Sequence, residues 1–484
     1  MASWTGPLER VDRWRWDIPV SYKQEMRVPG RIYADGRLME QMREEQALDQ
    51  VANVACLPGI VGHSLAMPDM HQGYGFPVGG VAAMRVSDGV VSPGGVGVDI
   101  NCGVRLLRTA LTEKDVRPKL SKLADALYKL VPAGTGVGSG AAMSEKDFEQ
   151  VLVQGAAWPV SQGMGHPLDL EVTEERGRLR GADPAQVSAR ARGRGRQQLG
   201  TLGSGNHFLE IQIVADILLP DVATAFGLTE PGQVVVMIHT GSRGLGYQVC
   251  DDHVRIAEAA AKRYGIDIPD RQLACTPIQS PEGQNYLAAM AAAANFAFAN
   301  RQVIAANARL AFGDVLGRSS VREMRQVYDV CHNIAKLETY DIDGVTVELC
   351  VHRKGATRAF PAHHPGIPEK YREVGQPVII PGDMGRESYV AVGTEAALTE
   401  TFGSSCHGAG RLMSRGAARR SLEGVDMVKR MAKDGVIVRA QSKQTLAEEA
   451  PSAYKNVSEV VSIVEGAGIA RAVARLRPIC VIKG

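Results

Sequence analysis

The sequence predicts a mixed α+β fold that forms one large domain over residues 1–484. Helical segments and short β-branched runs are both present, but the helices do not alternate regularly with the runs. Rossmann and TIM folds require that alternation, so neither fits this chain. No Pro/Ser-rich linker divides the sequence, and we therefore expect one domain rather than several small ones.

Four segments carry apolar residues at helical spacing. The second contains KLSKLADALYKLV, and the third begins with Ser144 followed three residues later by Asp147, the spacing of a capping box. We expect helices over residues 38–55, 113–131, 144–155 and 284–312.

Eight short runs rich in β-branched residues predict strands. The last run, ICVIKG, is apolar enough to be a buried strand, which would hold the otherwise frayed Lys483 in place. We expect strands over residues 103–109, 208–214, 233–240, 345–352, 376–381, 388–393, 436–440 and 479–484.

The composition excludes several classes of protein. Glycine makes up 53 of 484 residues, about 11%, against ~7% on average, but it does not recur at every third position as in collagen. The apolar share of 45% argues against a disordered linker. The net charge of +2 does not by itself predict a nucleic-acid binder, although a local basic groove is compatible with it.

The sequence also predicts a cytoplasmic protein. No run of 18 apolar residues occurs, and the first residues contain no apolar signal region, so neither membrane insertion nor secretion is expected. The eight cysteines show no C-x-x-C spacing, and we expect free thiols.

Glycine gathers in six polar turns beside the expected strands. The same turns contain His, Cys, Asp and Asn, as expected where backbone comes close to a ligand. These turns cover residues 71–80, 92–105, 199–210, 239–246, 381–385 and 406–410.

Five side chains that can bind metal lie in these glycine-rich turns or beside apolar segments. A single histidine there is more often a core residue, but five residues in one kind of setting favour a metal site. One thiol, one carboxylate and three imidazoles suit Mn²⁺, Fe²⁺, Co²⁺ or catalytic Zn²⁺, and these residue types leave the metal undecided. A shared thiolate would suit paired ions, which clamp attacking and leaving oxygens in phosphoryl transfer. The five residues are Asp99, Cys102, His207, His239 and His332.

Two further segments suggest phosphate chemistry. His407 lies in CHGAG, where it could attack the α-phosphorus of a nucleotide, although a surface histidine in a helix-leading loop is equally compatible. Residues 353–361 predict a basic loop with Lys354 and Arg358, which suits phosphate or simply solvent.

Together these motifs resemble the RtcB-type RNA ligases, which use GTP and Mn²⁺. The resemblance runs from about residue 25 to Gly484, and several of its motifs are long. They are MPDMHQGYGFPVGG, GVGVDINCGVR, LGTLGSGNHFLE, HTGSRGLG, RKGATRAFP, CHGAGR with MSR, APSAYK and the terminal IKG.

The resemblance implies a site with two Mn²⁺ ions bridged by Cys102. Asp99 and His207 would complete the ligands of one ion, and His239 and His332 those of the other. Asp69 would orient this machinery, and the resemblance makes His407 the residue that is guanylylated. It also implies an RtcB-type fold with the ligands on glycine-rich turns at strand ends.

The resemblance further implies a GTP pocket and an RNA surface. Glu210 makes sense as the guanine reader, because a carboxylate accepts from both N1–H and the 2-amino group, a donor pair that adenine lacks. The other pocket residues would be Asn206, Phe208, Asp383, Ser388, His407, Gly408, Ala409, Gly410, Tyr454 and Lys483. The residues expected near RNA phosphates are Arg192, Lys354, Arg358 and Arg411, with Arg194 and Arg196 beside the first.

The implied reaction joins a 2′,3′-cyclic-phosphate or 3′-phosphate RNA end to a 5′-OH end through an RNA(3′)pp(5′)G intermediate. tRNA halves or other broken RNAs would be substrates, with an archease-type activator as a further partner. Asp383 departs from the serine expected there, and a carboxylate near a triphosphate is unfavourable unless it meets a metal or an arginine. Two alternatives stay open: an enzyme that caps or processes RNA 3′ ends without sealing, and a non-catalytic RNA-binding protein.

Overall fold

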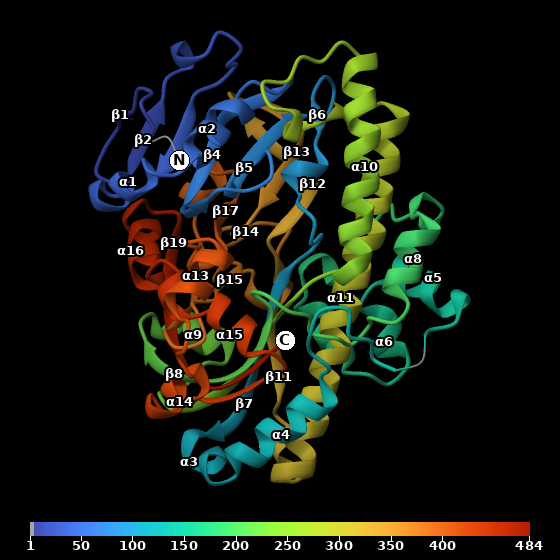
Figure 1. Ribbon diagram of the computed structural model, residues 1–484, viewed down its shortest axis with the longest axis vertical. Coiled ribbons are helices and arrows are strands. Elements are labelled where there is room, and N and C mark those ends of the chain that lie inside the picture. Colours follow the sequence, from blue (N-terminus) through green and yellow to red (C-terminus); the bar gives the residue numbers. More distant parts are fainter. Residues whose placement is uncertain (1–3, 141) are drawn as a thin grey trace.

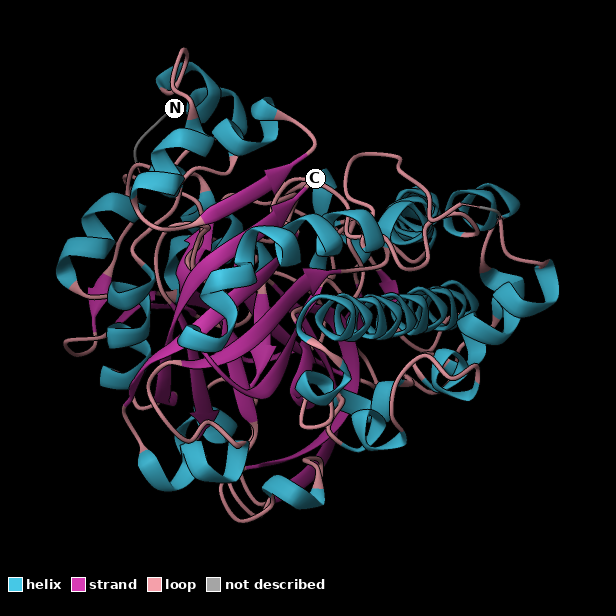
Figure 2. Cartoon of the chain, turned by 90° about the horizontal axis from the view of Figure 1, so that it is seen from below, coloured by secondary structure: helices cyan, strands magenta, loops and turns pink. Residues whose placement is uncertain are grey.

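The computed structural model describes residues 4–140 and 142–484, and it confirms the predicted mixed α+β architecture. Two large β-sheets occupy the middle of the molecule, with helices around them (Figures 1 and 2). Residues 1–3 and 141 of the predicted domain lie outside the described residues, and the single-domain organisation stays a prediction.

The first sheet has seven strands in the order β1-β2-β3-β4-β5-β13-β12. Its pairs are antiparallel except for β3 and β4, which run parallel. The strands are β1 (Glu9–Arg10), β2 (Arg15–Ile18), β3 (Gly30–Tyr33), β4 (Ile60–His71), β5 (Val78–Arg85), β13 (Val345–Lys354) and β12 (Asn333–Ile342).

The second sheet has eight strands in the order β11-β7-β9-β8-β19-β16-β15, with β18 pairing parallel to β19. Its strands are β11 (Arg325–Cys331), β7 (Gly103–Thr112), β9 (Gln233–Thr240), β8 (Phe208–Ile217), β19 (Ala470–Lys483), β16 (Ser388–Gly393), β15 (Pro377–Ile380) and β18 (Ile437–Ala440). Two short ribbons pair β6 (Val90–Val91) with β10 (Thr276–Pro277) and β14 (Ala356–Arg358) with β17 (Ser404–Cys406).

All eight predicted strands are present. Strands β4, β5, β11 and β12 were not predicted, because they contain too many Gly, Ala, Met or polar residues to stand out as β-branched runs.

The register of the second sheet brings five strand ends to one edge. Gly103 at the start of β7 pairs with Thr240 at the end of β9 and with Cys331 at the end of β11. Phe208 at the start of β8 pairs with Lys483 near the end of β19. Antiparallel neighbours begin and end at the same edge, so the turns attached to these residues lie together.

Sixteen α-helices occur in the described residues. The longest, α11, has 36 residues and runs beside α10 along one side of the molecule (Figure 1). No helix within residues 4–140 and 142–484 is long and apolar enough to cross a membrane. The helices are α1 (Gly36–Met42), α2 (Ala47–Val54), α3 (Glu113–Val116), α4 (Leu120–Leu130), α5 (Glu145–Gln154), α6 (Ala157–Ser161), α7 (Pro167–Glu171), α8 (Ala189–Gly195), α9 (Pro220–Phe226), α10 (Arg243–Arg263), α11 (Pro281–Leu316), α12 (Glu395–Glu400), α13 (Arg415–Ser421), α14 (Met427–Lys433), α15 (Lys443–Glu448) and α16 (Val457–Gly466).

Two predicted helices are each interrupted. The helix expected over 38–55 is α1 followed by α2, because a charged turn at 43–46 lets both helices bury their apolar residues in one core. The helix expected over 113–131 is broken by a 3₁₀ turn that contains Pro118, which has no N–H to donate. The other two predictions are confirmed: Ser144 caps α5, and α11 includes all of 284–312.

The predicted basic loop at 353–361 is wrong, because its basic residues lie at the end of β13 and in β14, and only residue 355 and residues 359–361 are outside strands. The Arg353 guanidinium is buried and lies 2.8 Å from a Glu338 carboxylate oxygen. Arg358 is buried as well and lies 2.7 Å from a Glu175 oxygen. The acidic partners of Arg358 come from a segment far away in sequence, so the local pattern could not show them.

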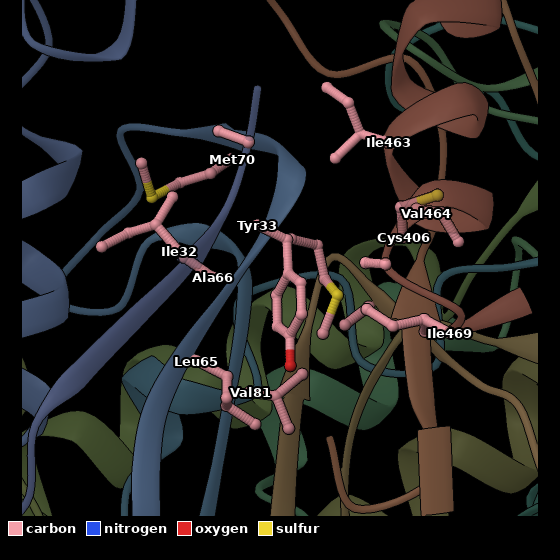
Figure 3. Packing of buried hydrophobic residues seen from close by; sticks show 14 of the residues in the cluster. Ile32, Tyr33, Leu65, Ala66, Met70, Val81, Cys406, Ile463, Val464 and Ile469 are labelled. Atoms are coloured by element: carbon pink, nitrogen blue, oxygen red, sulfur yellow. The ribbon is translucent and has the colours of Figure 1, made fainter. Parts of the chain in front are cut away.

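One apolar core joins the first sheet to the C-terminal segments. Residues of β3, β4 and β5 face α16 and the end of β17 across this core (Figure 3). Burial of apolar side chains contributes roughly 1.5–3 kcal/mol each, so the contact fixes the segment that leads into His407 against β4. The labelled members are Ile32, Tyr33, Leu65, Ala66, Met70, Val81, Cys406, Ile463, Val464 and Ile469.

Helix α11 provides a test of this packing. Phe312 is fully buried in the core under β8 and β9, whereas Leu310 on the same helix is 57% exposed. Replacing Phe312 with Ala should lower the free energy of unfolding by about 3–5 kcal/mol, because it leaves a cavity. Leu310→Ala should change it by less than about 0.5 kcal/mol. Urea denaturation of both variants checks this, and equal effects would contradict the assigned orientation of α11.

Candidate functional site

The five predicted metal ligands converge at the shared edge of the second sheet. Cys102 Sγ lies 3.4 Å from His207 Nε2 and 3.3 Å from His239 Nε2. His239 Nε2 lies 3.2 Å from His332 Nε2, and His207 Nε2 lies 2.8 Å from an Asp99 carboxylate oxygen. Residues from four separate stretches of chain therefore point one ligand atom each toward a common centre.

These ligand atoms form two groups of three that share Cys102. One group is Cys102, His239 and His332, and the other is Asp99, Cys102 and His207; within each, the ligand atoms lie within 4.8 Å of one another. The donors combine one soft thiol with imidazole and carboxylate, a set that fits a borderline divalent ion. The shared sulfur gives the arrangement that the resemblance implies for a pair of ions.

Burial keeps the imidazoles in their metal-binding form. It lowers the pKa of both His239 and His332 well below the usual range, so both rings are neutral at pH 7. Burial also raises the pKa of the Cys102 thiol, an effect that a bound cation would reverse. For Asp99, burial works against ionisation, but the His207 ring and other neighbours outweigh it and hold the pKa at about 2.

A backbone carbonyl group orients the His207 ring through the nitrogen that faces away from the ligand groups. Its Nδ1 lies 3.0 Å from the Leu202 carbonyl oxygen, a contact that places the proton on Nδ1 and leaves Nε2 free to bind a metal. The turn between these residues is the glycine-rich segment that precedes β8.

Glycine is required where backbone meets the site. A Cβ on Gly241 would lie 2.6 Å from both Asp99 carboxylate oxygens. Gly410 has a φ of +73°, and its Cβ would lie 2.2 Å from the Asp69 carbonyl oxygen. Neither position leaves space for a side chain, which accounts for part of the glycine surplus.

His407 lies directly after β17, beside the ligand groups. Its ring packs on that of His332, with 4.8 Å between ring centroids. Its Nδ1 lies 2.6 Å from an oxygen of the fully buried Asp69, and the same oxygen accepts the backbone N–H groups of His407 and Gly408. Asp69 therefore holds the Nδ1 side of the ring and leaves Nε2 as the reactive nitrogen.

A cavity of about 270 Å³ lies over the ligand groups and His407. Most of the predicted nucleotide-binding residues line it, as do four of the five metal ligands; His207 lines a neighbouring groove instead. The predicted nucleotide-binding residues in its wall are Asn206, Phe208, Asp383, His407, Gly408, Ala409, Gly410, Tyr454 and Lys483.

Glu210 and Ser388 adjoin the cavity but do not line it. Both are buried, and the Gln212 side-chain amide donates to a Glu210 carboxylate oxygen at 2.6 Å and to Ser388 Oγ at 3.1 Å. Burial raises the pKa of Glu210, an effect that the nearby Lys483 partly offsets. These two residues form a hydrogen-bonded network with Gln212 that borders the pocket.

Asp383 meets an arginine, which removes the electrostatic objection to a carboxylate at this position. Its side chain accepts the backbone N–H groups of Gly385 and Arg386 at 3.0 Å and forms an ion pair with the Arg386 guanidinium. Its charge is compensated within the turn itself.

The four predicted RNA contacts divide into two pairs. Arg192 forms ion pairs with Glu145 and Glu149, and Arg358 is the buried residue described above; neither lines the cavity. Lys354 and Arg411 do line it. Lys354 donates to the Tyr74 and Phe76 carbonyl oxygens, and Arg411 forms an ion pair with Glu449.

A second groove of about 520 Å³ reaches the metal ligands from the other side. It contains Asp99 and His207 together with Arg194, Arg243 and the half-exposed Tyr247. Among the described residues, neither Arg194 nor Arg243 forms an ion pair with a carboxylate. Sequence reasoning had not singled out Arg243, although it lies within the HTGSRGLG motif.

Arg415 and Glu449 were also missed. Arg415 lies in both the cavity and the groove, and it forms an ion pair with Glu449 in the cavity wall. The MSR segment was a visible signal for Arg415, and Glu449 directly precedes the APSAYK motif without belonging to it.

Comparison with known proteins agrees with this geometry. A family model described as "tRNA-splicing ligase RtcB" matches residues 50–484. The chain belongs to the RtcB family. It is 56% identical over 479 residues to the tRNA-splicing ligase RtcB of Thermococcus kodakarensis, with 99% of each chain covered. The corresponding proteins of Archaeoglobus fulgidus and Pyrobaculum aerophilum are 54% and 51% identical over 480 residues, again with 99% of each chain covered.

Membership of the RtcB family makes this protein a ligase. The family match begins at residue 50, so β1, β2, β3 and α1 precede it. The curated RtcB relatives match over nearly the whole chain and therefore include this N-terminal part.

The shared thiol makes a specific prediction for metal binding. Cys102→Ser should weaken the binding of a divalent metal ion in both ligand groups, by at least the ~10–100-fold typical when a residue behind the ligands is removed. Cys350→Ser is a matched control, because Cys350 is equally buried but belongs to β13 of the other sheet. Metal content after dialysis checks both variants. Unchanged metal content in Cys102→Ser would contradict the shared-ligand arrangement.

Proposed function

We propose that this RtcB-family protein is a GTP- and Mn²⁺-dependent RNA ligase. It would join RNA ends that carry a 2′,3′-cyclic phosphate or 3′-phosphate to 5′-OH ends. The observation that carries the proposal is the position of His407: its ring packs on His332, a member of one ligand group, and faces a cavity lined by the expected nucleotide-binding residues.

Asp99, Cys102, His207, His239 and His332 would hold two Mn²⁺ ions. Bound there, the ions would neutralise phosphate charge and align the attacking and leaving oxygens. The neutral imidazoles and the ionised Asp99 described above support this assignment, because these are the protonation states that bind cations.

In the first transfer, His407 Nε2 attacks the α-phosphorus of GTP. A phosphorus–nitrogen bond forms while the bond to the bridging oxygen breaks, and pyrophosphate leaves. The new phosphoramidate places positive charge on the imidazole, which the Asp69 carboxylate beside Nδ1 stabilises. The Gly408–Gly410 backbone lies in the same cavity and suits phosphate binding.

Recognition of guanine would fall to Glu210. Burial raises the pKa of Glu210 to about 8, so the two guanine donors would have to stabilise its ionised form. The ionised carboxylate can accept from guanine N1–H and the 2-amino group, whereas adenine offers no such pair. The Gln212 side-chain amide donates a hydrogen bond to one Glu210 carboxylate oxygen. Nucleotide binding would replace that hydrogen bond with hydrogen bonds from guanine to the carboxylate.

In the later steps, GMP moves from His407 to the RNA 3′-phosphate to form RNA(3′)pp(5′)G. A 5′-OH then attacks the 3′ phosphorus, GMP leaves and a 3′–5′ phosphodiester remains. The groove with Arg194 and Arg243 supports this scheme, because neither guanidinium group forms an ion pair there among the described residues and guanidinium groups suit RNA phosphates. Arg243 also acts electrostatically on the Asp99 carboxylate. Arg411 and Lys354 would contact phosphate from the cavity side.

The biological setting follows the curated relatives, which are named tRNA-splicing ligases. We propose tRNA splicing or repair of other broken RNAs as the role of this chain. A cytoplasmic location and an archease-type activator belong to the same proposal.

Covalent labelling tests the nucleophile. With Mn²⁺ and α-phosphate-labelled GTP, the wild-type protein should acquire an acid-labile label, because phosphoramidates hydrolyse in acid. His407→Ala should reduce the label to background. His63→Ala, which changes a partly buried histidine on β4, should label as the wild type does. A label that persists in His407→Ala would refute the assigned nucleophile.

A sealing assay separates the ligase from an end-capping enzyme. Incubation of 3′-phosphate RNA with a 5′-OH acceptor, GTP and Mn²⁺ should yield joined RNA. Arg194→Gln should raise the KM for RNA several-fold and reduce its salt dependence, as expected on loss of a phosphate contact. Arg37→Gln, which changes an exposed arginine on α1, is the control.

In the same assay, capped RNA ends that accumulate without joined product would instead favour the 3′-end guanylyltransferase. Absence of both label and product would favour a non-catalytic RNA-binding protein.

A further inference from the structure

Two adjacent residues of α11, Asn300 and Arg301, contact the backbone of the segments that carry the metal ligands. Both are fully buried, and neither contributes a ligand atom to the two groups of three. Sequence reasoning included them only as part of a predicted helix. Their hydrogen bonds give them a role that this pattern did not indicate.

The Arg301 guanidinium connects three segments. Its Nη1 donates to the Asn101 carbonyl oxygen at 2.8 Å and to the Thr240 carbonyl oxygen at 2.9 Å. Its Nη2 donates to Asn101 Oδ1 at 2.9 Å and to Asp329 Oδ1 at 2.8 Å, and its Nε donates to the same carboxylate. All five N–H donors of the group are therefore used.

Asn300 connects two further stretches of backbone. Its Oδ1 accepts the backbone N–H groups of Gly200 and Thr201 at 2.7 and 3.1 Å. Its Nδ2 donates to the Thr201 carbonyl oxygen at 3.1 Å and to the Gly241 carbonyl oxygen at 3.2 Å. The turn that leads to His207 is thereby tied to the residues that follow His239.

Each contacted residue lies close to a metal ligand in sequence. Asn101 lies between Asp99 and Cys102, and Thr240 follows His239. The Asp329 partner lies three residues before His332 on β11, and Gly200 and Thr201 belong to the turn before His207. One helical turn of α11 thus touches the segments of all five ligands.

We propose that Asn300 and Arg301 are positioning residues that set the spacing between the two metal-ligand groups. The inference rests on the proposed metal site, which these residues do not touch. Strand pairing and other bonds, such as those from Thr240 Oγ1 to the Leu202 carbonyl oxygen and from Asn333 Nδ2 to the Asp99 carbonyl oxygen, join these segments two at a time. Asn300 and Arg301 instead contact all of them from one helix.

The geometry at Asn101 supports a positioning role over simple charge compensation. Asn101 has a φ of +53°, a left-handed conformation that asparagine tolerates better than most residues, and Arg301 binds both its carbonyl and its side-chain oxygen. Charge compensation of Asp329 does not require these bonds, because Arg105 also donates to that carboxylate, at 2.7 Å.

Arg105 therefore provides a matched control. It is as buried as Arg301 and shares Asp329 as its partner, but its other side-chain bond goes to Gln302 and none goes to Asn101 or Thr240. Arg301→Lys and Arg105→Lys both keep a positive charge beside Asp329. Only Arg301→Lys removes the guanidinium group that donates to the Asn101 and Thr240 carbonyl oxygens.

The test is a Co²⁺ titration of the metal-free full-length chain, followed by the visible absorption of the bound ion and by its thiolate charge-transfer band. We expect Arg301→Lys to weaken Co²⁺ binding about 10–100-fold and to alter the band, as is typical when a residue behind metal ligands is lost. Arg105→Lys should bind as the wild type does, and thermal unfolding should show both variants folded.

The outcomes separate the two proposals. If the wild type binds no Co²⁺ with a thiolate band, the metal site itself is refuted. If the wild type binds and Arg301→Lys binds equally well, or if Arg105→Lys is equally impaired, the positioning role is overturned. Should Arg301→Lys fail to fold, Asn300→Leu replaces it, because leucine is similar in size to asparagine but makes none of its four hydrogen bonds to Gly200, Thr201 and Gly241. Unchanged Co²⁺ binding in that variant would also overturn the inference.

Discussion

The antiparallel register of the second sheet is the constraint on which the site depends. Because β7, β8, β9 and β11 are paired as antiparallel neighbours, the strand ends that carry or adjoin the metal ligands meet at one edge. A slip of one residue in any of these pairs would turn the adjoining side chains to the opposite face. The strand ends fix the approximate positions of the ligands, and the buried side of α11 connects the turns attached to them.

Compensation of buried charge is the second organising feature. Uncompensated buried charges are costly, and the carboxylates around the site each face a cationic or donor group. Asp329 faces Arg301 and Arg105, Glu449 faces Arg411, and Asp69 accepts two backbone N–H groups beside His407. The net charge of +2 hides this arrangement, because paired charges cancel in the total. The net charge also hides the arginines of the groove, because a local cluster of positive charge does not show in the total for the whole chain.

Sequence reasoning succeeded where the signal was local. Short β-branched runs predicted eight strands, and Ser144 marked the start of α5 because a cap acts within one turn of helix. It failed where the signal was not local. Pro118 breaks a helix that apolar spacing alone would continue. The basic residues of 353–361 suggested a solvated loop, because the acidic residues that pair with them lie far away in sequence.

By itself, the sequence determined the residue types of the site and the turns that carry them: His, Cys and Asp beside glycines such as Gly241 and Gly410, which sterics require. The resemblance already implied a shared Cys102, and the structure places its Sγ in both ligand groups. Only the tertiary structure decided that Asp69 faces His407 and that Arg301 anchors the turns. The physical reason is distance along the chain. Hydrogen bonds and ligand contacts act over about 3 Å, but the residues that make them here lie up to several hundred positions apart, and only the pairing of strands and the packing of α11 brings them together.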